Sequence, residues 1–455
     1  MNEKLNALID SYRDELTAML ARWIRTLSVK ADPADGAPFG QDVANMLEVA
    51  AADLRAMGLP VRTFDGYALD ATLGPEDQEM IAVLGHLDVV PVGEGWNDPP
   101  FGAVIRGDMM YGRGTQDDKG PVLAALFAMK ALKDAGVPMK RSVRLILGGD
   151  EESGWEDMAY YCTHAVMPDM GFSPDASFPL INTEKGMIHM LGRAPAAKDG
   201  LQVLRMHNGE RMNVIPGEAS CVVAGGAELV ERVKAFARSS GLTVEATAVA
   251  DGVRIDAHGI GGHSAYPEHC RNANGMLLLT LKALGVRGPL AELADAYPME
   301  YDGKALGIAC CDEISGPLTC NVGILHLDDG VITASFDCRC PVCADLPGIE
   351  RSIRAHLPSF TMECNELKQP HHVPADSELV TKLLAAYESV TGLKGEAQST
   401  GGGTYAKVLK SGVAFGAVFP DEVELAHQPN ECVSISSLLR AAKVYADALL
   451  RLCCE

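Results

Sequence analysis

The sequence predicts an α/β fold of two domains, one of which is discontinuous. The chain has 455 residues, more than a single hydrophobic core usually supports. Apolar runs of strand length alternate with amphipathic helical stretches in residues 1–186 and 374–455, whereas residues 187–373 contain several short strand patterns with helices between them. We therefore expect a mixed sheet covered by helices in the two outer segments, with an α+β domain inserted between them.

Two periodicities define the elements of the discontinuous domain. Apolar residues at helical spacing predict a first helix over 5–28. Further helices are predicted over 40–57, 121–135, 376–391 and 433–454. Short apolar runs predict strands over 61–64, 67–73, 80–85 and 143–147. Pro121 suits the first turn of its helix and Gly136 suits its end, so the boundaries of this helix are the best defined.

The inserted domain has its own strands and helices. Runs rich in valine, isoleucine and threonine predict strands over 219–223, 242–245, 252–257 and 331–337. Helical spacing predicts helices over 226–239, 271–284 and 346–356. We expect these elements to form a separate α+β layer with its own sheet.

Composition excludes several classes of partner. The formal net charge of −22 argues against nucleic acid and anionic membranes as partners. No apolar stretch reaches the roughly 18 residues of a membrane span, and the charged, amphipathic start of the chain does not resemble a secretory signal. The 13 cysteines are odd in number and lack the spacing of a disulfide framework, which predicts reduced thiols and a cytoplasmic location.

The group Cys338, Cys340 and Cys343 has a spacing that metal sites use, but it lacks a convincing fourth ligand. Small buried or half-buried cysteines are the ordinary interpretation of such a group. Its role stays open on the sequence alone.

Metal-type side chains follow the predicted strands of the discontinuous domain. His86 and Asp88 come directly after the run 80–85, and the acidic triplet 150–152 follows the run 143–147. Asp117 and Asp118 lie between them in a glycine-flanked turn before the helix that begins near Pro121. Each motif alone is more often structural or solvated. Because sites in open α/β sheets form at the carboxyl ends of strands, the set predicts a metal hydrolase with imidazole and carboxylate ligands.

Position along the strand suggests individual roles. Residues i and i+2 of a strand point to the same side, so Asp88 can accept the second N–H of His86 and orient its ring. Adjacent side chains that leave a strand point in different directions. This favours proton transfer for Glu151 and metal binding for Glu152.

Taken together, these motifs resemble the M20 family of di-zinc metallopeptidases, and most closely its bacterial PepV-like dipeptidase branch. The resemblance extends over nearly the whole chain. The matching segments are 85–91, 95–101, 111–121, 150–153, 171–176, 261–268, 401–405 and 426–431.

The resemblance implies two divalent metal ions, with zinc the first expectation and manganese or cobalt as alternatives. His86 and Asp175 would bind one ion, Glu152 and His427 the other, and Asp117 would bridge both. It also implies a cis peptide bond between Asp117 and Asp118, with Asp118 a neighbour of the metals and not a ligand.

The resemblance further implies the catalytic and substrate-binding residues. Glu151 would act as general base toward a water between the metals, and Asp88 would support His86. His263 of the inserted lid domain would stabilise the oxyanion. The implied substrate-binding residues are Asn213, Arg339, Gly402, Gly403 and Thr404. A guanidinium pairs bidentately with a carboxylate, which is the role implied for Arg339.

A dipeptidase that hydrolyses a dipeptide or another small amide is the leading hypothesis. An N-acyl amino acid deacylase with the same site is the first alternative. A catalytically silent binding protein would be expected to lack Glu151 or a metal ligand, and neither is missing. A thiol-based redox protein would show a C-x-x-C in a strand–helix turn, which the sequence lacks. A monomer or weak homodimer is expected, and the side chains preferred in the substrate stay open.

Overall fold

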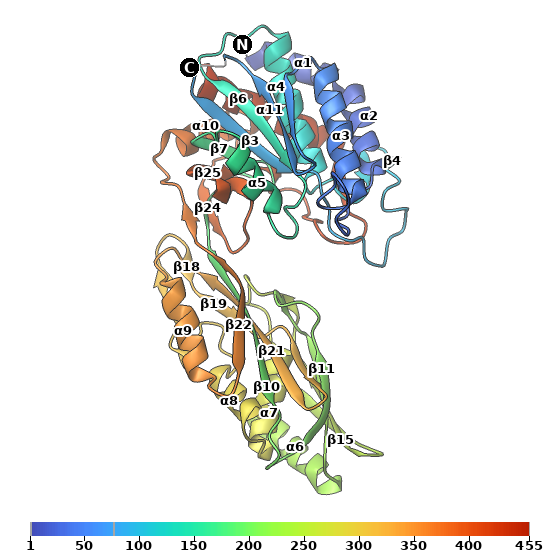
Figure 1. Cartoon of the computed structure of the whole chain (residues 1–455), viewed down its shortest axis with the longest axis vertical. Helices are drawn as coiled ribbons and strands as arrows, with labels where there is room; N and C mark the ends of the chain where they lie inside the picture. Colours follow the sequence, from blue (N-terminus) through green and yellow to red (C-terminus); the bar gives the residue numbers. More distant parts are fainter. Residues whose placement is uncertain (1, 76–77, 455) are drawn as a thin grey trace. The chain divides into compact units, whose positions relative to one another are not determined.

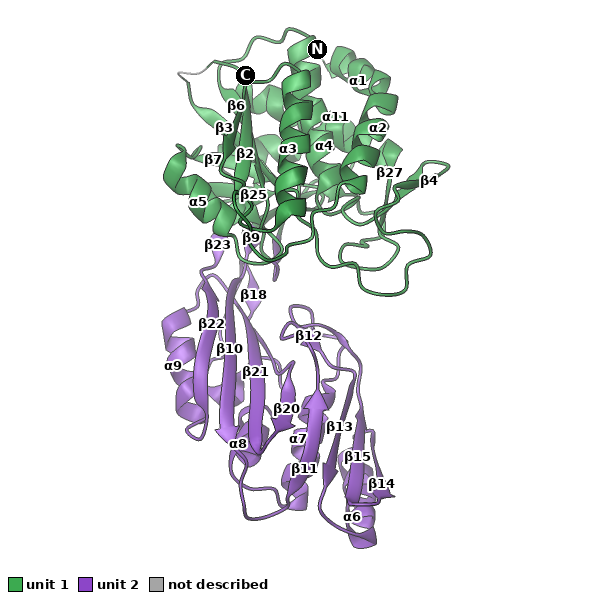
Figure 2. Ribbon diagram, turned by 45° about the vertical axis from the view of Figure 1, so that its right-hand side comes forward, with its two compact units in different colours: residues 1–182, 372–398, 403–455 green, residues 183–371, 399–402 purple. Residues whose placement is uncertain are grey.

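The computed structural model describes residues 2–75 and 78–454 of the chain (Figure 1). The chain divides into two compact units (Figure 2). The first unit takes in Met1–Asn182, His372–Gln398 and Gly403–Glu455, and the second takes in Thr183–His371 and Ser399–Gly402. These boundaries differ by a few residues from those that the sequence predicts. Ser399–Gly402, which the sequence pattern assigns to the discontinuous domain, groups with the second unit.

The first unit is built on a mixed sheet with the strand order β1-β2-β6-β3-β7-β25-β9-β23, in which β24 also pairs with β9. The neighbours β6, β3, β7 and β25 run parallel, whereas β1, β2 and β6 pair in antiparallel fashion. The strands are β1 Val61–Phe64, β2 Ala68–Leu73, β3 Met80–His86, β6 Ser142–Gly148, β7 Met170–Ser173, β9 Leu180–Glu184, β23 His371–His372, β24 Ala397–Thr400 and β25 Ser411–Ala414.

Both faces of this sheet are covered because its central strands are apolar on both sides. Ile81 and Val83 of β3 enter the main core, whereas Ala82 and Leu84 enter a smaller cluster on the other face. This is the alternation that a strand imposes. The helices of the unit are α1 Asn2–Ser11, α2 Arg13–Arg25, α3 Gln41–Ala56, α4 Lys119–Asp134, α5 Glu156–His164, α10 Glu378–Thr391 and α11 Ile435–Cys453, with a 3-10 turn η2 Tyr405–Val408.

Short strands complete the first unit. One small sheet has the order β27-β5-β4, and β26 pairs with β8 in parallel fashion. Their bounds are β4 Val104–Arg106, β5 Met109–Tyr111, β8 Ala176–Ser177, β26 Ala417–Val418 and β27 Cys432–Ser434.

The second unit carries a sheet with the order β14-β15-β13-β11-β20-β21-β10-β22, in which β19 also pairs with β21. Its pairings are antiparallel. One face packs against helices in a separate core, and residues that point to the other face are more exposed, as is usual for such sheets. The strands are β10 Gly186–Pro195, β11 Val203–Asn208, β13 Glu218–Val223, β14 Val244–Val249, β15 Gly252–His258, β19 Thr319–Asn321, β20 Leu325–Asp328, β21 Val331–Cys340 and β22 Thr361–Lys368.

The helices of the second unit are α6 Ala227–Ser240, α7 Ala273–Leu284, α8 Pro289–Ala296 and α9 Leu346–His356, with a 3-10 turn η1 Lys304–Leu306. Two small ribbons complete the unit: β12 Val214–Ile215 with β16 Gly262–His263, and β17 Cys311–Asp312 with β18 Gly316–Pro317.

The predicted α/β class is confirmed, with a mixed sheet covered by helices and an inserted α+β unit. The single helix predicted over 5–28 is wrong. The chain breaks between α1 and α2 at Tyr12, whose N–H donates to the carbonyl oxygen of Ile9 at 3.1 Å in a tight turn. Because Ile9, Tyr12 and Leu16 all enter the same core, the apolar spacing continues across the break and conceals it.

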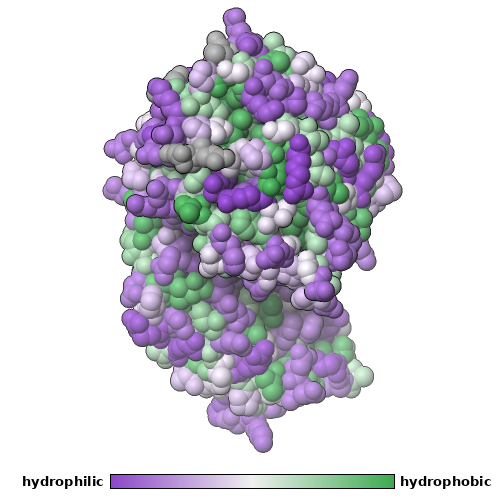
Figure 3. All heavy atoms as spheres, turned by 45° about the horizontal axis from the view of Figure 1, so that its top comes forward, coloured by the Kyte–Doolittle hydropathy of each residue, from purple (hydrophilic) through white to green (hydrophobic). Residues whose placement is uncertain are grey.

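The visible surface is mostly polar. Hydrophilic side chains cover much of the face seen in Figure 3, with apolar ones scattered among them. Among the helices of residues 2–75 and 78–454, none has the length and apolar character needed to cross a bilayer. The cysteines in the described part of the chain are free thiols.

Candidate functional site

Strand ends of the first-unit sheet place four of the predicted site residues. His86 is the last residue of β3, Glu151 and Glu152 follow β6, and Asp175 follows β7. These three strands are parallel neighbours, so their carboxyl ends meet at one edge of the sheet. The hydroxyl of Ser173 donates to the carbonyl oxygen of Leu84 at 2.8 Å, which ties the end of β7 to β3 just before the two ligands.

Two loops bring the remaining candidate ligands to this edge. Asp117 lies in the turn before α4, and His427 lies in the segment between β26 and β27. His86 Nε2 is 3.0 Å from Asp117 Oδ1, and His427 Nε2 is 2.9 Å from Asp117 Oδ2. His427 Nε2 is also 3.0 Å from Glu152 Oε1. The two oxygens of Asp117 therefore face two different histidines.

The donor set fits divalent metal ions. His86, Asp117 and Glu152 form one group whose ligand atoms lie within 4.8 Å of one another, and His86, Glu151 and Asp175 form a second. His86 Nε2 is 3.8 Å from Asp175 Oδ2. Ligands of a tetrahedral zinc ion lie roughly 3.3 Å from one another, so these separations approach those of a coordinated site. Imidazole with carboxylate suits zinc, manganese or cobalt.

Electrostatics at this edge also favour cations. Burial, and then the negative charge of Asp117, raise the pKa of Asp175 to about 8. Burial, and then the charge of Asp175, raise the pKa of Glu151 well above its usual range. Hydrogen bonds with Asp117 and then Glu152 raise the pKa of His427 to about 11. Carboxylates crowded in a half-buried site repel one another, and bound cations would relieve that repulsion.

His86 presents the correct nitrogen for a metal, and Asp88 contacts its other nitrogen. Its Nδ1 lies 3.0 Å from the main-chain oxygen of Asp88, which can only accept, so Nε2 is left to bind a metal. The Asp88 carboxylate is 3.4 Å from Nδ1 and also accepts the N–H groups of Glu151 and Glu152, each at 3.1 Å. Because β3 ends at His86, strand alternation does not extend to Asp88.

Glu431 also belongs to the site, although the sequence alone suggests no role for it. Its buried carboxylate accepts the N–H groups of Gly114, Gln116 and Asp117 at 3.0, 2.8 and 3.2 Å, and pairs with Arg113 at 2.7 Å. Glu431 therefore fixes the loop that carries Asp117 through hydrogen bonds with the backbone of that loop. The sequence feature that could have indicated Glu431 is the segment 426–431, which resembles the family and contains both His427 and Glu431.

Asp157 supports the acidic triplet in a similar way. It accepts the N–H groups of Gly149 and Asp150 at 2.7 and 2.9 Å and the hydroxyl of Tyr405. Nothing in the spacing of Asp157 distinguishes it from an ordinary residue at the start of a helix.

Asp118 does not belong to the candidate ligand groups. The Asp117–Asp118 peptide bond is cis, as the family resemblance implies. The Asp118 carboxylate is buried and accepts the N–H of His86 at 3.2 Å. A Cβ on Gly85 would lie 2.6 Å from that carboxylate and 2.3 Å from Val122, so the close approach requires glycine.

The second unit contains its own set of predicted residues. β12 pairs with β16, so Val214, next to Asn213, lies opposite His263. The carbonyl oxygen of Asn213 accepts the N–H of Ser264 at 3.0 Å. His263 is exposed, and its Nδ1 accepts the N–H of Ala265 at 3.2 Å, so a neutral ring carries its proton on Nε2.

Arg339 is buried at the end of β21 and oriented by its own strand. Its Nε and Nη2 donate to the two carboxylate oxygens of Asp337 at 2.8 and 2.9 Å, and Nη1 donates to the carbonyl oxygen of Gly401 at 2.9 Å. Asp337 also accepts the hydroxyl of Ser264 at 2.9 Å. Asp337 thus links Ser264, the residue after His263, to Arg339 in one hydrogen-bonded network.

The glycine-rich segment divides between the units. In the second unit the N–H of Gly402 donates to Thr400 Oγ1 at 3.1 Å, so this N–H already has an acceptor within the protein. Gly403 and Thr404 belong to the first unit, where the Thr404 side chain caps η2 by accepting the N–H of Ala406 at 3.2 Å. The structure therefore does not show these three residues as one set of donors.

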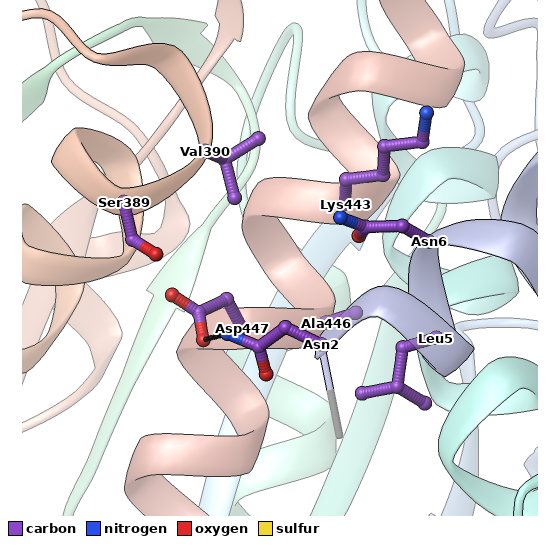
Figure 4. Close-up of a pocket in the computed structure, with 8 residues that line it drawn as sticks. All are labelled: Asn2, Leu5, Asn6, Ser389, Val390, Lys443, Ala446 and Asp447. Carbon is purple, nitrogen blue, oxygen red and sulfur yellow. Dashed lines mark hydrogen bonds between the residues drawn. The ribbon is translucent and has the colours of Figure 1, made fainter.

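A pocket elsewhere in the first unit contains none of the predicted site residues. It lies among α1, α10 and α11 and has a volume of about 130 Å³ (Figure 4). Asn2 donates to Asp447 at 2.8 Å within it. Because none of its lining residues belongs to the ligand cluster, this pocket has no part in the chemistry described above.

Metal binding gives the first testable prediction. His427→Ala should weaken the binding of one ion more than that of the other, because His427 lies 2.9 Å from Asp117 and 3.0 Å from Glu152, whereas His86 lies near Asp117 and Asp175. Titration of the metal-free protein with Zn²⁺ or Co²⁺ would measure both affinities. His164→Ala, at an exposed histidine of the same unit, is the control. Two unchanged affinities in the His427 variant would rule out its role as a ligand.

The chain is similar to several known proteins. The model of a peptidase family, M20/M25/M40, matches residues 82–451. A Bacillus subtilis (strain 168) protein named "Putative dipeptidase YtjP" is 38% identical over 435 residues, which are 92% of this chain and 92% of that protein.

Solved structures show the same fold. A dipeptidase from Saccharomyces cerevisiae, Dug1p, aligns with a TM-score of 0.64 at 16% identity over 99% of this chain and 98% of its own. Human carnosine dipeptidase 1 aligns with a TM-score of 0.62 at 17% identity over 99% of each chain.

Proposed function

We propose that this chain is a metal-dependent dipeptidase. The chain belongs to peptidase family M20/M25/M40, and the proposal starts from that membership. The observation that carries the proposal is the placement of Asp117, whose two oxygens face His86 and His427 separately. One carboxylate between two such histidines is the arrangement expected of a bridge in a two-metal site. The dipeptidase name of the Bacillus subtilis relative supports the substrate class.

The proposed ligands are His86, Asp117 and Asp175 for one ion, and Asp117, Glu152 and His427 for the other. Two divalent ions held there, with zinc expected before manganese or cobalt, would polarise the scissile carbonyl and lower the pKa of a bound water. Glu431 and the main-chain oxygen of Asp88 keep Asp117 and His86 in place for this role.

Glu151 is the proposed general base. Its carboxylate lies in the ligand cluster with His86 and Asp175, and its backbone N–H is fixed by Asp88. A raised pKa suits a group that accepts a proton from the attacking water and then delivers it to the leaving amine.

His263 is the proposed oxyanion donor. Because Nδ1 accepts from Ala265, Nε2 is the nitrogen that carries the proton in the neutral ring. A fixed N–H donor of this kind stabilises negative charge that develops only in the transition state.

His263→Ala should lower kcat by about 10²-fold while metal content stays unchanged, because loss of one oxyanion donor typically costs on that order. Steady-state kinetics and metal analysis of the same preparation would measure both quantities. His269→Ala, at a nearby exposed histidine, is the control. Loss of metal, or a change confined to KM, would contradict the proposed role.

A substrate panel tests the proposed function as a whole. The protein loaded with Zn²⁺, Mn²⁺ or Co²⁺ should hydrolyse dipeptides in preference to tripeptides and N-acyl amino acids. A preference for N-acyl amino acids would support a deacylase with the same metal site. No hydrolysis of any of these amides by the fully loaded protein would overturn the proposal.

A further inference from the structure

Two histidines and an aspartate lie together on the second-unit sheet, apart from all the residues discussed above. His207 on β11 is directly opposite His326 on β20, and Asp328 follows two residues later on β20 (Figure 2). Met206, next to His207, enters the core of the unit, so His207 points to the opposite, exposed face. Strand register alone brings the three side chains to one place.

Their geometry resembles an open coordination site. The two imidazole rings stack with centroids 3.7 Å apart and planes inclined by 18°. His207 Nδ1 is 4.0 Å from Asp328 Oδ2, and one ligand atom from each residue lies within 4.8 Å of the others. Binding of one ion would require the two rings to rotate out of the stack, so that a lone pair of each points to the ion and the ligand atoms approach to roughly 3.3 Å. His207 and Asp328 have room for such movement, with 69% of each side chain exposed.

A second observation points to a ligand. His326 Nε2 is 2.9 Å from the carbonyl oxygen of Gly209, which can only accept, so Nε2 carries a proton and Nδ1 keeps its lone pair. A histidine whose other nitrogen donates to a carbonyl is the usual arrangement of a metal-bound imidazole. Gly209 has φ +76°, and a Cβ there would lie 2.0 Å from the oxygen of Gly323, so glycine is required where this carbonyl is presented.

We propose that His207, His326 and Asp328 form a third metal site, which binds one divalent transition-metal ion. Two imidazoles and one carboxylate select Zn²⁺, Cu²⁺ or Ni²⁺ over Mg²⁺ and Ca²⁺, and water completes the coordination. The ion joins β11 to β20 at the centre of the sheet, where the half β14-β15-β13-β11 meets the half β20-β21-β10-β22. Its role is to hold these halves together, and it does not depend on the proposed peptidase activity.

The test is calorimetric titration of the full, tag-free chain already loaded with two equivalents of Zn²⁺. A third Zn²⁺ should bind to the wild type with a stoichiometry near one, and Mg²⁺ should give no such event. His207→Ala and His326→Ala should abolish the event, and Asp328→Asn should weaken it by about 10-fold, on the scale of a lost ligand or its support. His258→Ala, at another histidine of this sheet, should retain it, since His258 pairs with Glu218.

Hydrogen exchange provides a second readout that does not depend on stoichiometry. The third equivalent of Zn²⁺ should slow amide exchange in β11 and β20 of the wild type and leave both His variants unchanged. Thermal unfolding without added metal would confirm that the variants fold. Absence of a third event in the wild type, or its persistence in His207→Ala and His326→Ala, would overturn the proposal.

Discussion

Glu151→Gln is expected to retain both metal ions and to lose at least about 100-fold in kcat, because general base catalysis typically contributes 10²–10⁴-fold. The glutamine amide has nearly the shape of the carboxylate but cannot accept the proton of the attacking water. The proposed ligands His86, Asp117, Glu152, Asp175 and His427 are untouched by this change. The measurement is kcat on a good dipeptide together with metal content of the same sample.

A matched control separates catalysis from local structure. Glu156→Gln alters an exposed carboxylate five residues along the chain, at the start of α5, and should leave kcat unchanged. Near-normal kcat in fully metallated Glu151→Gln would disprove the proton-transfer role. Loss of metal would instead indicate that Glu151 is a ligand, as its proximity to His86 and Asp175 allows.

Amidation of the substrate carboxylate is the second change with a large expected effect. A good dipeptide should lose about 30-fold or more in kcat/KM when its carboxylate becomes an amide, and tripeptides should be poor substrates. Loss of the charge-assisted hydrogen bonds between Arg339 and the substrate carboxylate would cost roughly 1.5–3 kcal/mol, and about 1.4 kcal/mol corresponds to tenfold in rate. Asp337 accepts from two N–H groups of the guanidinium and the carbonyl oxygen of Gly401 from a third, so we expect the substrate carboxylate at the two that remain.

Arg339→Ala should therefore remove most of the distinction between the acid and the amide while activity on the amide persists. Activity on the amide also shows that the variant is folded. Arg254→Ala, at a more exposed arginine of the same unit that pairs with Asp256, should keep the distinction. Equal cleavage of a dipeptide, its amide and the tripeptide by the wild type would refute the proposed carboxylate site.

Residue type and short-range spacing were sufficient to predict the α/β class and a metal site near His86, Asp117 and Glu152, whereas Asp175 was indicated only by the resemblance of segment 171–176 to a known family. His86 follows a buried apolar run, and Glu151 and Glu152 follow another. A run of this kind forms a strand whose end presents the next residues at the sheet edge. His427 has no such local signal, and only the resemblance of segment 426–431 to a known family indicated it.

Other features depend on contacts between residues far apart in sequence. The break at Tyr12 leaves no mark in the apolar spacing, because residues on both sides enter one core. Glu431 holds a loop more than 300 residues away, which no local pattern encodes. Asp88 accepts the backbone N–H groups of Glu151 and Glu152, which lie 63 and 64 residues further along the chain.

By itself the sequence determined the fold class, many of the elements and the chemistry that the strand ends can carry, because periodicity and side-chain type act over a few residues. Only the tertiary structure decided which groups meet. It set Asp117 between two histidines, joined Ser264 to Arg339 through Asp337, and placed His207 opposite His326 by strand register. The physical reason is that long-range pairing and packing, which a local pattern does not contain, fix these distances.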